Sequence, residues 1–209
     1  MKASVKKYCE DLIKSFDTIP AERKATLLRI SEYIKAKQEA HLPIQLIYIC
    51  THNSRRSHFG QVWAQVASNY FGIKSVSTFS GGTQATAFNS HAIDALQKIG
   101  FDIRKLDATN NPIYELSYDE KENSILCFSK IYNHEKNPQQ HFAAIMTCSE
   151  ADENCPFIAG AALRINTSYE DPKLFDNTNL QAAKYDEKCR QIALETFYAF
   201  SNSIKQQVL

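Results

Sequence analysis

The chain has 209 residues, of which 24 are lysine or arginine and 23 are aspartate or glutamate, so its formal net charge is +1. This length suits one α/β domain, with or without a small appendage, and is sufficient to bury a core. The balanced charge argues against a broad surface for nucleic acid or membrane. The sequence contains no run of about 18 apolar residues, and residues 1–4 do not begin a signal peptide. We therefore expect a cytoplasmic protein that binds neither nucleic acid nor membrane.

Six cysteines are spread along the chain, at positions 9, 50, 127, 148, 155 and 189. A chain of this size without an export signal does not need a disulfide framework, so reduced thiols are expected. No Cys-x2-Cys pair and no Cys/His cluster at zinc-finger spacing occurs in the sequence. The sequence therefore predicts no metal site and no bound cofactor.

Two amphipathic helices are predicted at the N-terminus. The first covers residues 4–16, and the second runs from Pro20 to about Glu39, with Leu27, Ile30 and Ile34 on one face. Together they predict a helical hairpin. We expect this hairpin to be an extension over residues 1–41, followed by the main domain over residues 42–209.

An alternation of strands and helices follows the hairpin. Its strands are short, β-branched and apolar, as expected for strands buried on both faces of a parallel sheet. Its helices are closed by Gly72 and Gly100. In chain order the predicted elements are a strand over 45–49, a helix through 59–70, a strand over 75–79 and a helix over 89–99. This order predicts parallel βαβ units.

The second half of the chain is less regular. Residues 113–118 alternate like an edge strand and could pair with residues 125–128 across the polar turn 119–124, which predicts an inserted β-hairpin. The remaining predicted elements are a buried strand over 142–147 that ends at Cys148, a short strand near Ile165 and a long helix from about 180 to 203.

The segment from Cys50 to Ser57 reads Cys-Thr-His-Asn-Ser-Arg-Arg-Ser and lies between a predicted strand and a predicted helix. A loop that leads into a helix N-terminus presents unpaired backbone N–H groups and partial positive charge. Such a place binds a tetrahedral oxyanion and stabilises a thiolate. Cys50 is therefore the predicted nucleophile. The residues predicted to form the oxyanion-binding loop are Thr51, His52, Asn53, Ser54, Arg55 and Ser57.

Arg56 is the predicted clamp for the oxyanion, because a guanidinium can hold two oxygens of a phosphate or arsenate at once. Ser57 could form a hydrogen bond with the thiolate, and Asn53 could tie loop carbonyls together. The alternative interpretation is a buried cysteine beside a basic turn. The flanking strand and helix favour the catalytic interpretation.

This loop resembles the Cys-x5-Arg-Ser loop of the low-molecular-weight protein tyrosine phosphatase superfamily. Residues 80–83 (Ser-Gly-Gly-Thr) and Asn89 resemble the segment after that family's second strand, and Asp171-Pro172 resembles its Asp-Pro loop. The similarity covers about residues 44–203. It implies a four-stranded parallel sheet flanked by helices, with the active loop after the first strand.

The resemblance also implies a role for each matching residue. Cys50 would be the nucleophile, Arg56 the oxyanion clamp and Ser57 a group that stabilises the thiolate. Asn53 would hold the loop shape, and Asp171 would protonate the leaving oxygen, as displacement at phosphorus or arsenic requires.

Two further cysteines distinguish between branches of the superfamily. Cys148 and Cys155 resemble the redox pair of the thioredoxin-coupled arsenate reductases, in a similar acidic segment that ends Cys-Pro. The resemblance implies that Cys50 attacks arsenate, that Cys148 attacks the sulfur of the adduct, and that Cys155 then forms a Cys148–Cys155 disulfide. Each exchange is a thiolate attacking sulfur. A thioredoxin-type external reductant would be the partner that restores the thiols.

Two alternatives remain open. The chain could be a phosphatase that hydrolyses phosphotyrosine or small phosphate monoesters through a phosphocysteine intermediate, which would use Cys50, Arg56 and Asp171 but not the other cysteines. It could also be a binding module whose N-terminal helices bind a partner or a second copy of the chain and so make an oligomer. The arsenate reductase interpretation is preferred because of Cys148 and Cys155.

Overall fold

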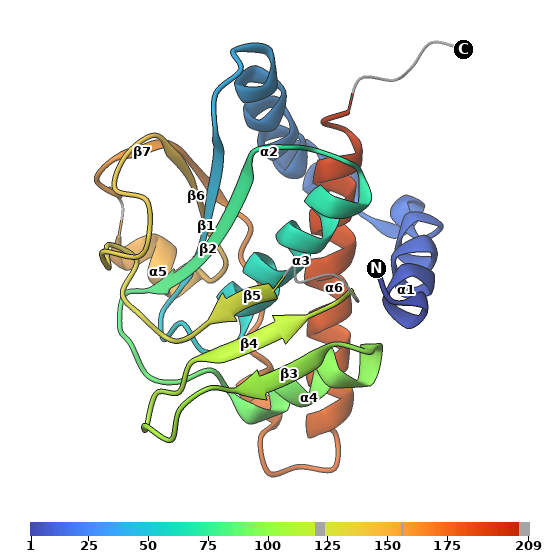
Figure 1. Cartoon of the computed structure of the whole chain (residues 1–209), viewed down its shortest axis with the longest axis vertical. Helices are drawn as coiled ribbons and strands as arrows, with labels where there is room; N and C mark the ends of the chain where they lie inside the picture. Colours follow the sequence, from blue (N-terminus) through green and yellow to red (C-terminus); the bar gives the residue numbers. More distant parts are fainter. Residues whose placement is uncertain (120–123, 156, 205–209) are drawn as a thin grey trace.

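A four-stranded parallel sheet forms the centre of the chain in the computed structural model, which describes residues 1–119, 124–155 and 157–204 (Figure 1). The strand order is β2-β1-β6-β7, and all three pairings are parallel, as the sequence predicted. The strands are β1 (Ile44–Cys50), β2 (Val76–Gly82), β6 (Phe142–Met146) and β7 (Ala161–Asn166). β1 lies between two neighbours, so its carboxyl end, where Cys50 lies, is enclosed by the sheet.

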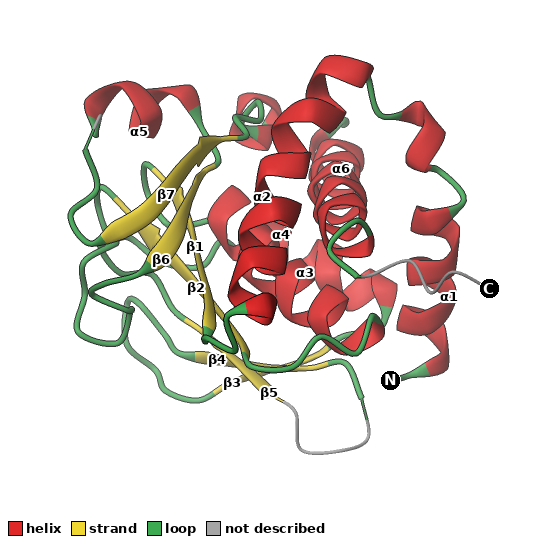
Figure 2. Cartoon of the chain, turned by 90° about the horizontal axis from the view of Figure 1, so that it is seen from above, coloured by secondary structure: helices red, strands yellow, loops and turns green. Residues whose placement is uncertain are grey.

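Helices cover the two faces of the sheet unequally (Figure 2). Side chains of alternate residues point to opposite faces, so Leu46 and Tyr48 join the main core beneath the larger helical layer. Ile47 and Ile49 join a second, smaller core that includes Ala151. The helices of the larger layer are α2 (Ala21–Glu39), α3 (Arg56–Tyr70), α4 (Ser90–Ile99) and α6 (Gln181–Ser201), whereas α5 (Ser149–Asn154) lies on the opposite face.

Both predicted N-terminal helices are present and pack against α6. The first, α1 (Ala3–Ile13), also contacts α4, whereas α2 also contacts β1 and β7. A short 3₁₀ turn, Phe16–Thr18, follows α1. The buried side chains of both helices belong to the same core as those of α3 and α6. The division of the chain at residue 41 stays a prediction.

Replacement of Leu27 on α2 by alanine is expected to destabilise the whole chain. Leu27 is 1% exposed within the main core, and truncation of such a leucine costs about 2–5 kcal/mol through lost burial and the cavity left behind. Leu42, in the connection to β1, is 50% exposed. Leu42→Ala is therefore expected to change the free energy of unfolding by less than about 0.5 kcal/mol. Urea unfolding of both variants measures the difference. Equal midpoints would contradict a shared core.

An antiparallel sheet with the order β3-β4-β5 is inserted between α4 and β6. β4 (Tyr114–Ser117) and β5 (Ser124–Cys127) form the predicted hairpin, although residues 120–123 of the predicted turn lie outside the described residues. A third strand, β3 (Asp102–Lys105), pairs with β4 and was not predicted. Its four residues are mostly charged, so they carry no apolar alternation. The Arg104–Glu115 ion pair of 2.7 Å joins β3 to β4 instead.

In the part of the chain that the structure describes, no helix is both long enough and apolar enough to span a membrane.

Candidate active site

The predicted oxyanion loop connects the end of β1 at Cys50 to the start of α3 at Arg56. Its carbonyl groups point outward and are bound by neighbouring segments. The carbonyls of Cys50, Thr51, His52 and Ser54 accept hydrogen bonds of 2.8–3.2 Å from Thr83, Gln84, Thr86, Asn89 and Ser129. In a trans peptide unit the N–H points opposite to the C=O. The following amide N–H groups are therefore turned toward the inside of the loop, where an oxyanion would accept hydrogen bonds from them.

Gly82 permits this close packing of the loop against β2. A Cβ atom at this position would lie 2.7 Å from the Thr51 carbonyl oxygen and 2.8 Å from the Asn53 amide nitrogen. Both distances are shorter than side-chain carbon atoms tolerate, so glycine allows the loop backbone to approach the strand. Residues 80–83 of this chain resemble the superfamily's segment after its second strand, and this steric requirement explains the glycine at position 82.

Asn53 is the left-handed residue of the loop, with φ of +44°. Asparagine adopts this conformation more readily than most non-glycine residues. Its side chain is fully buried and bridges two segments: Nδ2 donates to Ser57 Oγ at 2.9 Å, and Oδ1 accepts from the Lys130 amide at 2.8 Å. Asn53 was expected to bind carbonyl groups, but it binds a hydroxyl and an amide instead.

Cys50 Sγ and Ser57 Oγ lie 3.1 Å apart in the interior of the loop. Because Asn53 already donates to the Ser57 oxygen, the Ser57 hydroxyl hydrogen is free to be directed at the sulfur. The structure thus brings Cys50, Asn53 and Ser57 together in one hydrogen-bonded cluster.

Arg56 connects this loop to the segment around Asp171. Its guanidinium donates to the Tyr169 carbonyl at 2.8 Å and to Asp171 Oδ2 at 2.6 Å. The Arg56 side chain is 9% exposed, and within the described residues its Nε atom has no hydrogen-bond partner. Asp171 also caps a 3₁₀ turn, Pro172–Phe175, by accepting from the Lys173 amide at 3.0 Å. Arg56 and Asp171 therefore lie in direct contact, and the Nε donor of Arg56 remains available for another acceptor.

Arg55 points to the same side and forms a second ionic group. Its Nε donates to the Tyr185 hydroxyl at 2.6 Å, and its guanidinium lies 3.5 Å from Asp176 Oδ2 and 4.0 Å from Asp171 Oδ1. The Tyr185 hydroxyl in turn donates to Asp176 at 2.9 Å, and burial raises the pKa of Tyr185 to about 12. Arg55 thus packs against α6 and the Asp171 segment through its side chain.

Cys148 lies against the oxyanion loop through Thr51. Its sulfur is 3.3 Å from Thr51 Oγ1, which donates to Glu150 Oε2 at 2.9 Å. The same sulfur accepts from the Ala151 amide at 3.4 Å at the start of α5. Cys148 is therefore held beside the loop that carries Cys50.

The six cysteines fall into two groups by their place in the structure. Cys50, Cys148 and the half-buried Cys155 belong to the small core around α5, whereas the other three are buried in the main core. Burial raises the pKa of each of those three to about 12, so they remain thiols at neutral pH. They are Cys9, Cys127 and Cys189.

Several residues around the site were not predicted from the sequence. Tyr185 and Asp176 hold Arg55, Glu150 accepts from Thr51, and Lys130 binds Asn53. Each contact joins residues at least 77 positions apart, so local periodicity gives no signal for it. The only sequence signal was Arg55 itself, because a cation in a buried loop needs a carboxylate nearby.

The chain matches no family model over its length. In sequence it is 27% identical over 128 residues to arsenate reductase 2 of Staphylococcus epidermidis, covering 61% of this chain and 77% of that protein. It is 25% identical over 153 residues to the arsenate reductase of Staphylococcus aureus, covering 73% of this chain and 94% of that protein.

Solved structures show the same fold. The low-molecular-weight phosphotyrosine phosphatase from Vibrio cholerae O395 superposes with a TM-score of 0.52 at 14% identity, covering 79% of this chain and 99% of that one. A YwlE mutant from Bacillus subtilis superposes with a TM-score of 0.51 at 13% identity, covering 76% of this chain and 97% of that one. The chain thus resembles bacterial arsenate reductases in sequence and has the fold of low-molecular-weight phosphotyrosine phosphatases.

Proposed function

We propose that this protein reduces arsenate to arsenite by a thiol relay through Cys50, Cys148 and Cys155. The observation that carries the proposal is the placement of Cys148 beside the oxyanion loop, 3.3 Å from Thr51 Oγ1 and in the same small core as Cys50 and Cys155. A phosphatase has no need of two further cysteines at this place. The similarity to arsenate reductases in sequence supports the same interpretation.

Arsenate would enter the loop with its oxygens directed at the amide N–H groups and at Arg56. The unused Nε of Arg56 would donate to one oxygen, which gives that buried donor a partner. The Cys50 thiolate attacks arsenic and an oxygen leaves as water, with a proton supplied by Asp171. The contact of 2.6 Å between Arg56 and Asp171 supports this role, because it would keep the carboxyl beside the residue that binds the oxyanion.

Reduction follows at sulfur. The Cys148 thiolate attacks Cys50 Sγ and forms a Cys50–Cys148 disulfide, while the sulfur–arsenic bond breaks and its electron pair stays on arsenic, giving arsenite. The Cys155 thiolate then attacks Cys148 Sγ, which releases Cys50 as thiolate and leaves a Cys148–Cys155 disulfide. An external dithiol of the thioredoxin type would reduce that bond by the same exchange and restore all three thiols.

The second candidate is phosphatase activity toward phosphotyrosine or small phosphate monoesters. The contact between Arg56 and Asp171, with Cys50 inside the loop, would serve phosphoryl transfer through a phosphocysteine equally well. Phosphate and arsenate share tetrahedral geometry and charge, so slow ester hydrolysis is compatible with the reductase proposal.

The deciding experiment measures arsenate-dependent NADPH oxidation with thioredoxin and thioredoxin reductase, alongside hydrolysis of para-nitrophenyl phosphate. We expect arsenate turnover in the original chain and its loss in Cys148→Ser, with ester hydrolysis retained. Cys9→Ala is the matched control, because Cys9 is buried in the main core, and it should retain both activities. Ester hydrolysis without any arsenate turnover would make the protein a phosphatase.

A further inference from the structure

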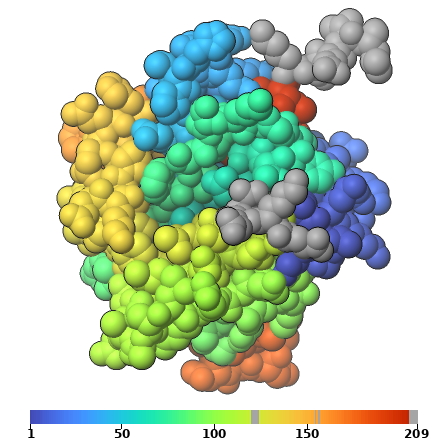
Figure 3. All heavy atoms as spheres, viewed as in Figure 1, coloured from blue at the N-terminus to red at the C-terminus, as the bar shows by residue number. Residues whose placement is uncertain are grey.

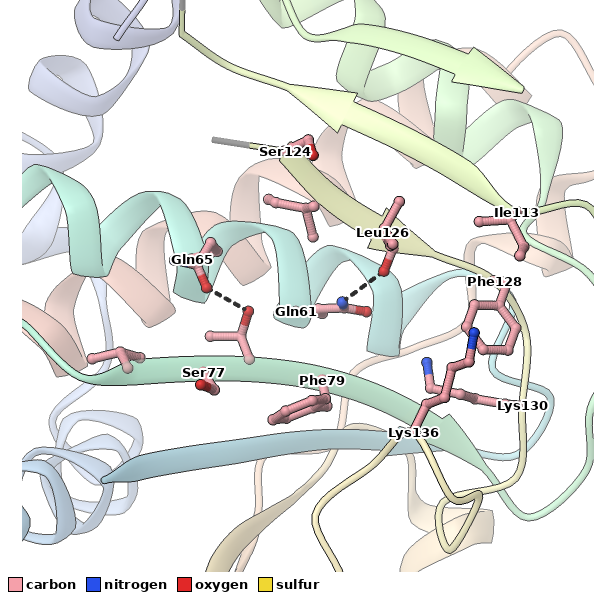
Figure 4. Close-up of a pocket in the computed structure, with 13 residues that line it drawn as sticks. Gln61, Gln65, Ser77, Phe79, Ile113, Ser124, Leu126, Phe128, Lys130 and Lys136 are labelled. Atoms are coloured by element: carbon pink, nitrogen blue, oxygen red, sulfur yellow. Dashed lines mark hydrogen bonds between the residues drawn. The ribbon is translucent and has the colours of Figure 1, made fainter. Parts of the chain in front are cut away.

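A groove with a volume of about 390 Å³ lies between the edges of the two sheets, away from Cys50 (Figure 4). β2 is one edge strand of the parallel sheet, and β5 is one edge strand of the antiparallel sheet. The helix α3 forms the floor between them, with Gln61 and Gln65 facing the groove. Small-molecule sites in proteins typically have volumes of about 300–1,000 Å³, so this groove is large enough for one.

One end of the groove holds a buried lysine. Lys130 is 4% exposed, and Figure 4 shows its ammonium directed into the groove. The structure, over its described ranges, gives this ammonium neither a hydrogen bond nor an ion pair; its near neighbour is the Phe128 ring, 4.4 Å from Nζ to the centroid. Burial lowers the pKa of Lys130 to about 8, with Lys136 acting in the same direction. At neutral pH the group is therefore mostly a buried cation that lacks an anion, which is a costly arrangement.

The rest of the groove combines a second cation with apolar walls. Lys136 is exposed at the same end, with Nζ 5.6 Å from the Phe128 centroid. Phe128 and Leu126 form part of the apolar lining, and Leu126, on β5, is 52% exposed although it is apolar. A ligand complementary to this surface carries negative charge at one end and an apolar body behind it.

We propose that this groove binds a small organic anion, with its carboxylate, sulfonate or phosphate group at Lys130 and Lys136 and its apolar body along Phe128 and Leu126. This site is distinct from the oxyanion loop. The Lys130 amide donates to Asn53 Oδ1, so Asn53 separates the groove from Ser57 and Cys50. The proposal goes beyond the reductase function and does not depend on it.

Titration with 8-anilinonaphthalene-1-sulfonate, an aromatic sulfonate that fluoresces when bound, tests the site on the full chain. We expect saturable binding at one site per chain. Lys130→Met should weaken it about 10- to 100-fold, as when a charge-assisted hydrogen bond is lost from a buried site. Lys6→Met, which removes an exposed lysine on α1, should change the affinity less than about twofold. Lys130→Met should also raise Tm by about 5 °C, because methionine has a side chain of similar length but lacks the buried charge.

Leu126→Glu tests the proposed anion site even if Lys130→Met fails to fold. Leu126 is largely exposed, so the substitution is compatible with folding, and the added negative charge should weaken sulfonate binding by about tenfold or more. Unchanged affinity in both Lys130→Met and Leu126→Glu would overturn the proposal.

Discussion

Replacement of Cys155 by serine is expected to limit arsenate reduction to about one arsenite per chain, because the Cys50–Cys148 disulfide formed in that event has no thiol to resolve it. Cys155 is half-buried at the end of α5, whereas Cys50 and Cys148 are almost fully buried. An external dithiol therefore reaches a bond that includes Cys155 more easily than a bond between Cys50 and Cys148. A rapid-quench assay that measures the arsenite formed per mole of protein tests this expectation.

The same variant should keep its ester hydrolysis, since the proposed phosphoryl transfer would use Cys50, Arg56 and Asp171 but not Cys155. We expect kcat for para-nitrophenyl phosphate within about twofold of the original chain. Cys189→Ala serves as the control for cysteine loss elsewhere: Cys189 lies in the main core, 3.3 Å from the Trp63 indole nitrogen, and its loss should leave repeated arsenate turnover intact. Repeated turnover in Cys155→Ser would exclude Cys155 from the relay.

Trapping of the intermediate gives an independent measurement. After one turnover the Cys155→Ser chain should hold a disulfide between Cys50 and Cys148, which peptide mass spectrometry detects after alkylation of the remaining thiols. In the original chain the disulfide should join Cys148 and Cys155.

Local sequence was sufficient to predict the parallel βαβ units and the loop between β1 and α3. β6 is a continuous apolar run and β1 is interrupted only by Gln45, which is typical of strands covered on both faces. The loop is contiguous, so its strand, turn and helix start could be recognised together. β3 could not be recognised, since Ile103 is its only apolar residue.

The more distant parts of the site were predicted only through resemblance. Asp171 and Cys148 lie about 100 residues from the loop, and neither periodicity nor composition places them beside it. The partners of Arg55 had no signal of either kind, because Asp176 and Tyr185 approach it only after α6 packs on α3. Contacts of this type depend on tertiary structure, which a single sequence does not display.

Replacement of Asn53 by alanine is expected to have the largest effect of any change in the loop outside the reacting groups. The side chain is fully buried and bridges Ser57 and the Lys130 amide, so both groups would lose a partner. Alanine would also have to adopt φ near +44°, which costs about 1 kcal/mol. Together these effects should lower the free energy of unfolding by about 2–4 kcal/mol. Urea unfolding measures that loss.

Activity should fall further than stability alone would explain. Without Asn53, Ser57 is free to rotate away from Cys50, and the amide N–H groups of the loop lose their fixed directions. Loss of such preorganised donors lowers kcat by about 100- to 1,000-fold. The fall should appear in arsenate reduction and in ester hydrolysis alike, because both reactions begin with the same thiolate and the same cradle.

Asn53→Gly separates the two contributions of this residue. Glycine adopts the left-handed conformation without strain, so this variant should recover about 1 kcal/mol of stability relative to alanine but little of the activity. Asn177→Ala is the matched control for the backbone alone, since Asn177 is an exposed residue with φ of +62° and should lose only about 1 kcal/mol. Full activity in Asn53→Gly would mean that the backbone conformation, and not the bridge to Ser57 and Lys130, keeps the loop in its reactive form.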